Sequence, residues 1–152
     1  MPFCPRPRLI AGAVVFVLLA AAGFLPLFGG PGYEQSLASG LVVPAAAAIA
    51  TATELSALDL APFACIVRGV ASGAALAAVA FSTALLHGLR VGICDFSGGA
   101  IYFALTAGFG AILGGTWGAV VAEACRGRTK ARRTACVLLA LAGPLACIAV
   151  SV

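Results

Sequence analysis

Five long apolar stretches alternate along the chain with shorter segments that hold most of its charged and turn-forming residues. The apolar stretches run at about 9–28, 36–53, 63–87, 100–124 and 134–152. Each is close to about 20 residues, the length at which a helix crosses the hydrocarbon core of a bilayer. The pattern therefore predicts an all-α, polytopic transmembrane helix bundle of five spans, with residues 1–152 forming a single domain.

The first stretch has a second interpretation, as a cleavable signal peptide. Arg6 and Arg8 precede its apolar run, and the sequence AAAG at 20–23 is similar to a small-residue cleavage site. Cleavage there would leave four spans and would not change the sidedness of the others. The sequence leaves both alternatives open.

The composition indicates that these stretches lie in lipid rather than in a soluble core. The chain is 62% hydrophobic and 9% charged, with a mean hydropathy of +1.14, whereas soluble domains carry about 25% charged residues. A soluble fold of 152 residues could not bury so much apolar surface, because small domains keep much of their surface in water. The lipid bilayer is thus the first expected partner.

The placement of the positive charges predicts an orientation. Five of the nine Lys and Arg residues lie in one run after the fourth stretch, at Arg126, Arg128, Lys130, Arg132 and Arg133. Beside membrane spans such a run indicates topology and contact with anionic lipids rather than a nucleic-acid site. With five spans, this run and the N-terminal arginines fall on one side. The expected location is therefore the cell inner (plasma) membrane, with the N-terminus cytoplasmic.

The loop LLHGLRVGICDFSGG between the third and fourth stretches gathers His87, Arg90, Cys94 and Asp95. A catalytic site would use Cys94 as nucleophile and His87 as base, but it also needs an orienting group and an oxyanion hole, which the sequence does not supply. A metal site would use His87, Cys94 and Asp95, yet zinc ligands usually come in closely spaced pairs. We therefore predict neither a catalytic nor a metal-binding role for these residues.

A polar rim between two membrane helices accounts for the same loop more simply. Gly88 would take the left-handed position after the helix that ends at His87. Arg90 would reach the outer headgroups or pair with Asp95, and Asp95 or Ser97 would cap the next helix. The alternative is that these charged residues line a substrate entrance.

Glycines at a spacing of four predict tight helix packing. Gly110, Gly114 and Gly118 form such a ridge in the fourth stretch, and Gly69 and Gly73 share the spacing in the third. Small residues at this spacing let two helix backbones approach closely in a membrane. We expect the ridge to contact another helix, either in this chain, in a homo-oligomer or in a partner protein. The fifth stretch shows no comparable ridge.

The six cysteines do not form a CxxC motif and no His-rich segment accompanies them. Most lie in or beside apolar runs, where a cysteine behaves as a small hydrophobic residue. This pattern predicts no disulfide framework and no cofactor.

Three strings carry a resemblance to a protein family. GYEQSLASGLVVP (32–44), HGLRVGICD (87–95) and GGTWGAV (114–120) resemble the N-terminal multispan region of delta-proteobacterial, myxobacterial-type envelope proteins. In those proteins a larger extracytoplasmic part follows the spans. No activity is established for that family, so the resemblance implies a location and an architecture only.

The expected function is accordingly non-enzymatic, as a membrane anchor or assembly module of a cell-envelope protein. A small transporter or channel component is the alternative, and an intramembrane enzyme is a third, less favoured class. A filled, dry bundle would favour the anchor, whereas charged residues around a central cavity would favour transport.

Overall fold

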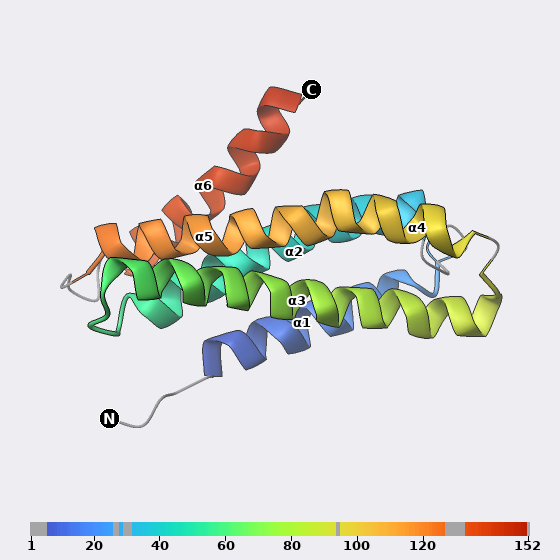
Figure 1. Cartoon of the computed structure of the whole chain (residues 1–152), viewed down its shortest axis with the longest axis horizontal. Helices are drawn as coiled ribbons and strands as arrows, with labels where there is room; N and C mark the ends of the chain where they lie inside the picture. Colours follow the sequence, from blue (N-terminus) through green and yellow to red (C-terminus); the bar gives the residue numbers. More distant parts are fainter. Residues whose placement is uncertain (1–5, 26–27, 29–31, 94, 127–132, 152) are drawn as a thin grey trace.

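The computed structural model describes residues 6–25, 28, 32–93, 95–126 and 133–151, and its regular structure there is helical throughout (Figure 1). The elements in chain order are α1 (Arg6–Ala22), α2 (Tyr33–Leu55), α3 (Pro62–Val91), α4 (Phe96–Phe103), the π-helical turn η1 (Ala104–Gly108), α5 (Phe109–Ala124) and α6 (Arg133–Ser151). Because α4, η1 and α5 follow one another without a break, they form one long helix. The fold class is all-α, with five helices in the described residues.

Three of these helices are long and apolar enough to cross a membrane. They are α2, α3 and the continuous helix Phe96–Ala124. The first helix has 17 residues, and the apolar part of α6 is the shorter segment Thr134–Cys147. The three long helices indicate a multi-pass membrane protein.

The predicted helix limits are wrong at two places near one end of the molecule. The first helix ends at Ala22 rather than at residue 28, where the chain turns through Gly23. The third helix continues past His87 to Val91, so Gly88 is helical and the positive φ of +95° belongs to Gly92. The added turn carries Arg90, which bonds the Gly23 carbonyl just after α1.

Successive helices run in opposite directions, and α1, α2, α3 and the α4–α5 helix lie side by side in Figure 1. We call one end of this bundle the Arg126 end; it holds the start of α1, the α2–α3 connection and the end of α5. The other end, where α3 finishes, is the His87 end. The last helix, α6, starts at the Arg126 end and leaves the bundle at an angle.

Small side chains dominate the interior. The main cluster takes its members from α1, α2, α3 and the α4–α5 helix, and it consists of Val15, Leu19, Val43, Ala47, Leu76, Ala80, Phe103, Ala107 and Ala111. A second cluster joins α2, α5 and α6 and includes Cys136 and Ala140. The fifth stretch, in which the sequence shows no ridge like that of the fourth, nevertheless buries two small side chains one turn apart, Cys136 and Ala140.

The π-helical turn in the fourth helix lies beside the first turns of α2. The hydroxyl of Thr106 donates to the carbonyl of Tyr102 in its own helix at 2.7 Å, and to that of Ser36 in α2 at 3.1 Å. Such turns insert one residue into a helix and often lie at functional sites. Here the turn contributes a polar contact between two helices that the apolar pattern does not reveal.

Candidate functional site

The glycine ridge of α5 lies directly on α2. A Cβ atom added at Gly110 would be 2.9 Å from Cγ of Pro44, and one added at Gly118 would be 2.9 Å from Cβ of Thr51. At Gly114 it would fall on the carbonyl oxygen of Pro44. Real Cβ atoms do not approach other atoms so closely, so this contact requires glycine. A partner helix could use the ridge only by displacing α2.

The neighbouring face of α5 packs on α3 in the same manner. A Cβ atom added at Gly69 would be 2.5 Å from the carbonyl oxygen of Gly115, and one added at Gly73 would overlap the carbonyl of Ala111. Helix α5 is therefore held on two sides through backbone contacts, with α2 on one side and α3 on the other. Close approach of this kind supplies van der Waals contact where lipid removes the hydrophobic driving force.

At the His87 end, two residues predicted for the polar rim hold the end of α1 against α3. The imidazole of His87 is buried, lies against Gly23 and meets the Phe24 ring edge-on, with centroids 5.4 Å apart. One turn later Arg90 donates to the Gly23 carbonyl at 3.1 Å, with its guanidinium carbon 4.5 Å from the centre of the Phe24 ring. We call this set the Gly23 contact.

The remaining rim residues have separate roles. The side chain of Asp95 caps α4, because its carboxylate accepts hydrogen bonds from the Gly98 amide at 3.0 Å and the Ser97 hydroxyl at 2.9 Å. These bonds, first that from Gly98, lower the pKa of Asp95 below its ordinary value. Since Arg90 bonds Gly23 instead, the proposed Arg90–Asp95 pair is replaced by two separate contacts. Cys94 lies outside the described residues.

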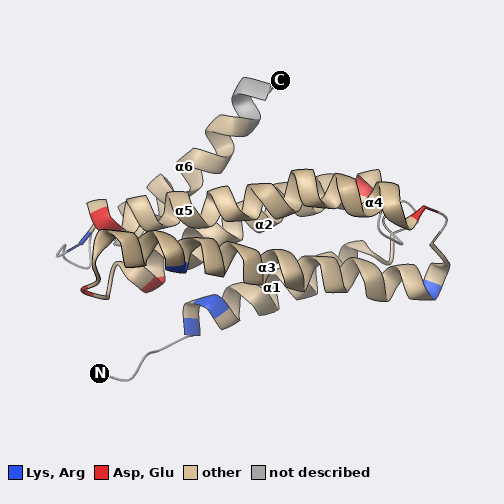
Figure 2. Ribbon diagram, in the orientation of Figure 1, with Lys and Arg blue, Asp and Glu red and all other residues tan. Residues whose placement is uncertain are grey.

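At the other end, where acidic and basic residues gather in Figure 2, Arg126 joins three parts of the chain. It forms an ion pair with Glu123 at 2.6 Å and another with Asp59 at 3.4 Å. The same guanidinium donates to the carbonyl of Leu60 at 2.7 Å and lies 3.4 Å from the sulfur of Cys65. Arg126, the first residue of the basic run, therefore links the end of α5 to the α2–α3 connection.

A second ion pair at the Arg126 end is largely removed from solvent. Arg8 of α1 donates to Glu54 of α2 at 3.2 Å, and the Glu54 side chain is only 3% exposed. Within the described part of the chain, Oε2 of Glu54 and Nε of Arg8 have no hydrogen-bond partner although both are buried. The pair neutralises two charges where α1 meets α2, which the sequence did not predict because the residues lie far apart along the chain.

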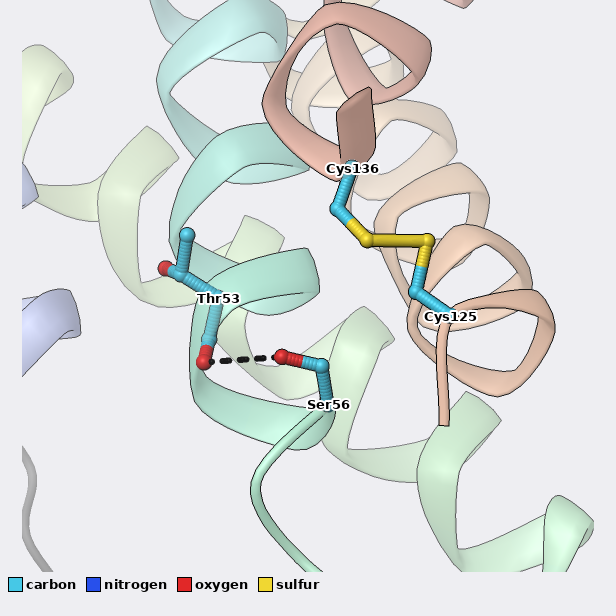
Figure 3. The surroundings of a disulfide bond; sticks show 4 residues. All are labelled: Thr53, Ser56, Cys125 and Cys136. Carbon is cyan, nitrogen blue, oxygen red and sulfur yellow. Dashed lines mark hydrogen bonds between the residues drawn. A yellow bond between two sulfur atoms is a disulfide. The ribbon is translucent and has the colours of Figure 1, made fainter. Parts of the chain in front are cut away.

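One pair of cysteines is bonded, although the sequence predicts no disulfide framework. Cys125 at the end of α5 is bonded to Cys136 in the first turn of α6, with 6.3 Å between their Cα atoms (Figure 3). Thr53 and Ser56, which end α2, lie close by in the same view and are linked by a hydrogen bond. The start of α6 lies beside the end of α5, and this brings together two cysteines that have no recognisable motif in the sequence.

Trp117 and two grooves flank α6. The indole nitrogen of Trp117 donates to the carbonyl of Leu139 at 3.0 Å, and the ring lies against Gly143. Beside it, a groove of about 420 Å³ lies between α2, α5 and α6. A second groove, of about 730 Å³, lies between α1, α2 and α6. Both are lined mainly by apolar side chains, and Leu41 and Pro144 border both.

The polar residues of the His87 end could be identified from the sequence, but the residues that they contact could not. His87 and Arg90 stand out as rare polar residues, whereas Gly23 and Phe24 belong to an ordinary apolar run. No protein-family model, curated protein or solved structure matches this chain.

Proposed function

We propose that this chain is a non-enzymatic anchor or assembly module, held in the cell inner membrane by five spans. The observation that supports this function most is the double backbone contact of α5. Gly114 touches Pro44 of α2, and Gly115 touches Gly69 of α3. Three helices packed backbone to backbone favour a filled bundle, which suits a protein that holds a position in the membrane rather than one that opens a path.

In this proposal α1 is retained in the mature protein and serves as the first span. Val15 and Leu19 of α1 are buried in the main cluster, and Arg8 neutralises Glu54. Removing α1 at the AAAG sequence would leave the buried Glu54 carboxylate without its partner, which is costly in a low-dielectric interior. The mass of the purified protein tests this point. Cleavage of a signal peptide would remove about the first 20 residues and lower the mass accordingly.

The proposed orientation puts the Arg126 end in the cytoplasm. Arg6 and Arg8 begin α1 at this end, where Arg8 pairs with Glu54 and Arg126 bonds Leu60, and the rest of the basic run follows Arg126 in the sequence. The positive-inside rule assigns such an end to the cytoplasmic side. The C-terminus of a five-span chain would then lie outside the cytoplasm.

A role in transport is the second candidate, and one observation favours it. Gln35, Ser39 and Ser72 are buried, and in the portion of the chain that the structure describes their side-chain polar atoms have no hydrogen-bond partner. Polar groups inside a membrane bundle can line a route for water or solutes. In an anchor the same groups would hold isolated waters or simply cost some stability.

Hydrogen–deuterium exchange of the protein in lipid nanodiscs separates the two functions. For an anchor we expect slow exchange along α2 from Val43 to Ala52 and along α5 from Ala111 to Ala122, because no water reaches these amides. The exposed residues around Asp59, between α2 and α3, serve as the fast-exchanging reference. Exchange of both core segments at rates near that reference would contradict the anchor and support an aqueous path.

A further inference from the structure

The groove between α1, α2 and α6 combines an apolar lining with a charged mouth. Its volume is about 730 Å³, and its lining runs from Pro7 and Thr53 at the Arg126 end to Leu18 and Leu41 further along the bundle. Pro144 and Leu145 of α6 close part of its remaining side. In a membrane protein, an apolar groove between helices is accessible to lipid acyl chains.

The length of the groove corresponds to one leaflet. Its lining on α1 extends from Pro7 to Leu18, which spans about 16 Å at a rise of 1.5 Å per residue. Half of the hydrocarbon core of a bilayer is about 15 Å thick. A lipid acyl chain that enters from the headgroups at the Arg126 end would therefore fill the groove and stop near the bilayer midplane.

The charge at the mouth favours an anionic headgroup. Arg6 is exposed and directly precedes Pro7, which lines the groove. The positive charge of Arg8 is matched by Glu54, so the sum of these three side chains is one positive charge. The α1 helix also begins here, and the positive end of its dipole adds to the attraction for a phosphate group.

We propose that this groove binds one anionic glycerophospholipid, with an acyl chain between α1, α2 and α6 and its phosphate beside Arg6. Lipid binding at this site requires only that the protein lies in a bilayer. The proposal therefore holds whether the protein is an anchor or a transporter. Basic pockets between membrane helices bind anionic lipid headgroups in the same way. Bound there, the lipid would fill the space that the angle of α6 leaves beside α1 and α2.

Native mass spectrometry of the delipidated protein in detergent tests the site with three probes. We expect phosphatidylglycerol to bind about fivefold more tightly than phosphatidylcholine of the same chains, the ratio that about one favourable arginine contact supplies. Glycerol phosphate, which has the headgroup charge but no acyl chain, should neither bind detectably nor displace the lipid. Equal affinity for the two lipids, or displacement by glycerol phosphate, would overturn the proposal.

Two pairs of variants assign the interaction to its residues. Arg6→Gln should abolish the preference for phosphatidylglycerol, whereas Arg6→Lys should keep most of it because the charge remains. Ala46→Phe places a ring in the groove and should weaken binding of both lipids, whereas Ala75→Phe, on the exposed face of α3, should not. A preference that survives Arg6→Gln, or equal binding by the two phenylalanine variants, would contradict the site.

Crosslinking with a photoreactive lipid tests the site in the wild-type protein, so the result does not depend on whether the variants fold. Phosphatidylglycerol with a diazirine in its acyl chain should crosslink the wild-type protein in nanodiscs within 7–18, 41–53 or 144–145. Crosslinks spread evenly over the exposed faces of α3 and α5 would show that lipids contact the chain without a preferred site, and would refute the proposal. Neither result changes what hydrogen–deuterium exchange of α2 and α5 says about the choice between an anchor and a transporter.

Discussion

Adding a single methyl group at Gly114 should loosen the bundle, although the same change usually stabilises a helix. A Cβ atom at this position would overlap the carbonyl oxygen of Pro44 and lie 2.9 Å from its Cα and carbonyl carbon. These are backbone atoms in the middle of α2, so they cannot rotate away as the end of a flexible side chain could. Relief requires the two helices to separate.

The magnitude follows from two opposing effects. Overpacking a filled interior costs about 1–3 kcal/mol, and overlap with three backbone atoms puts Gly114→Ala near the upper limit. The higher helix propensity of alanine offsets about 1 kcal/mol of this loss in stability. We therefore expect Gly114→Ala to lower the free energy of unfolding by about 2 kcal/mol, the difference between these two values.

Gly12→Ala is the matched control, because it makes the same substitution inside a helix. A Cβ atom at Gly12 would meet only Cδ2 of Leu76, at an ordinary 3.8 Å. Without a clash, only the propensity gain of about 1 kcal/mol remains, so this variant should be more stable than the wild type. The two alanine variants should therefore differ by about 3 kcal/mol and in opposite directions, the sum of the two shifts.

Unfolding in mixed micelles of dodecyl maltoside and SDS, followed by far-ultraviolet circular dichroism, measures both variants. Fluorescence of Trp117, the single tryptophan of the chain, gives a second probe at the contact of α5 with α6. A Gly114→Ala protein at least as stable as the wild type would refute the close contact between α2 and α5. A destabilised Gly12→Ala protein would instead show that alanine is unfavourable for a reason unrelated to packing.

Three further predictions concern the two polar ends. Arg8→Gln should lower the free energy of unfolding by about 3–5 kcal/mol, since it leaves a buried carboxylate unpaired. Glu54→Gln should cost less, because the freed arginine can reach the headgroups; the opposite order would contradict the pair. The pKa of Asp95 is lowered in the folded state, so its cap contributes fully above the unfolded pKa and is lost as the pH falls through the folded value. Thermal melts below pH 4 should show this loss in the wild type and not in Asp95→Asn, and identical profiles would argue against the cap. If the Arg126 end is cytoplasmic, maleimide mass-tagging after an acid quench should find Cys125 and Cys136 reduced in growing cells and bonded after purification in air. A bond already present in cells would overturn the proposed orientation.

The positions of the helices could be predicted from the sequence because they depend on local properties. Apolar length and the interruptions between apolar runs define where each helix lies, and each predicted stretch contains the larger part of one observed helix. The spacing of Gly110, Gly114 and Gly118 likewise marked the face of α5 that meets another helix. Asp95 was one of two residues expected to cap the fourth helix, and it is the cap.

What the sequence could not provide were contacts between residues far apart in the chain. His87 was expected at a polar rim, but it packs against Gly23, which the sequence marks only as part of a possible cleavage site and not as a contact of His87. Cys125 and Cys136 meet because the start of α6 lies beside the end of α5, and neither residue belongs to a motif. The π-helical turn is equally hidden, since Thr106 bonds to Ser36 of another helix.

The two-sided contact of α5 also limits how this protein can move. Rotation of α5 about its own axis would carry Cβ-bearing residues into the spaces at Gly114 and Gly115, where the backbones of α2 and α3 leave no room. Rotation is therefore blocked for α5, and α2, α3 and α5 must move as one rigid body. A force applied to this protein would instead displace α6, which meets α5 through the Trp117 hydrogen bond and has a groove on either side. A tilt of α6 against the block of α2, α3 and α5 is therefore a motion that these backbone contacts leave free.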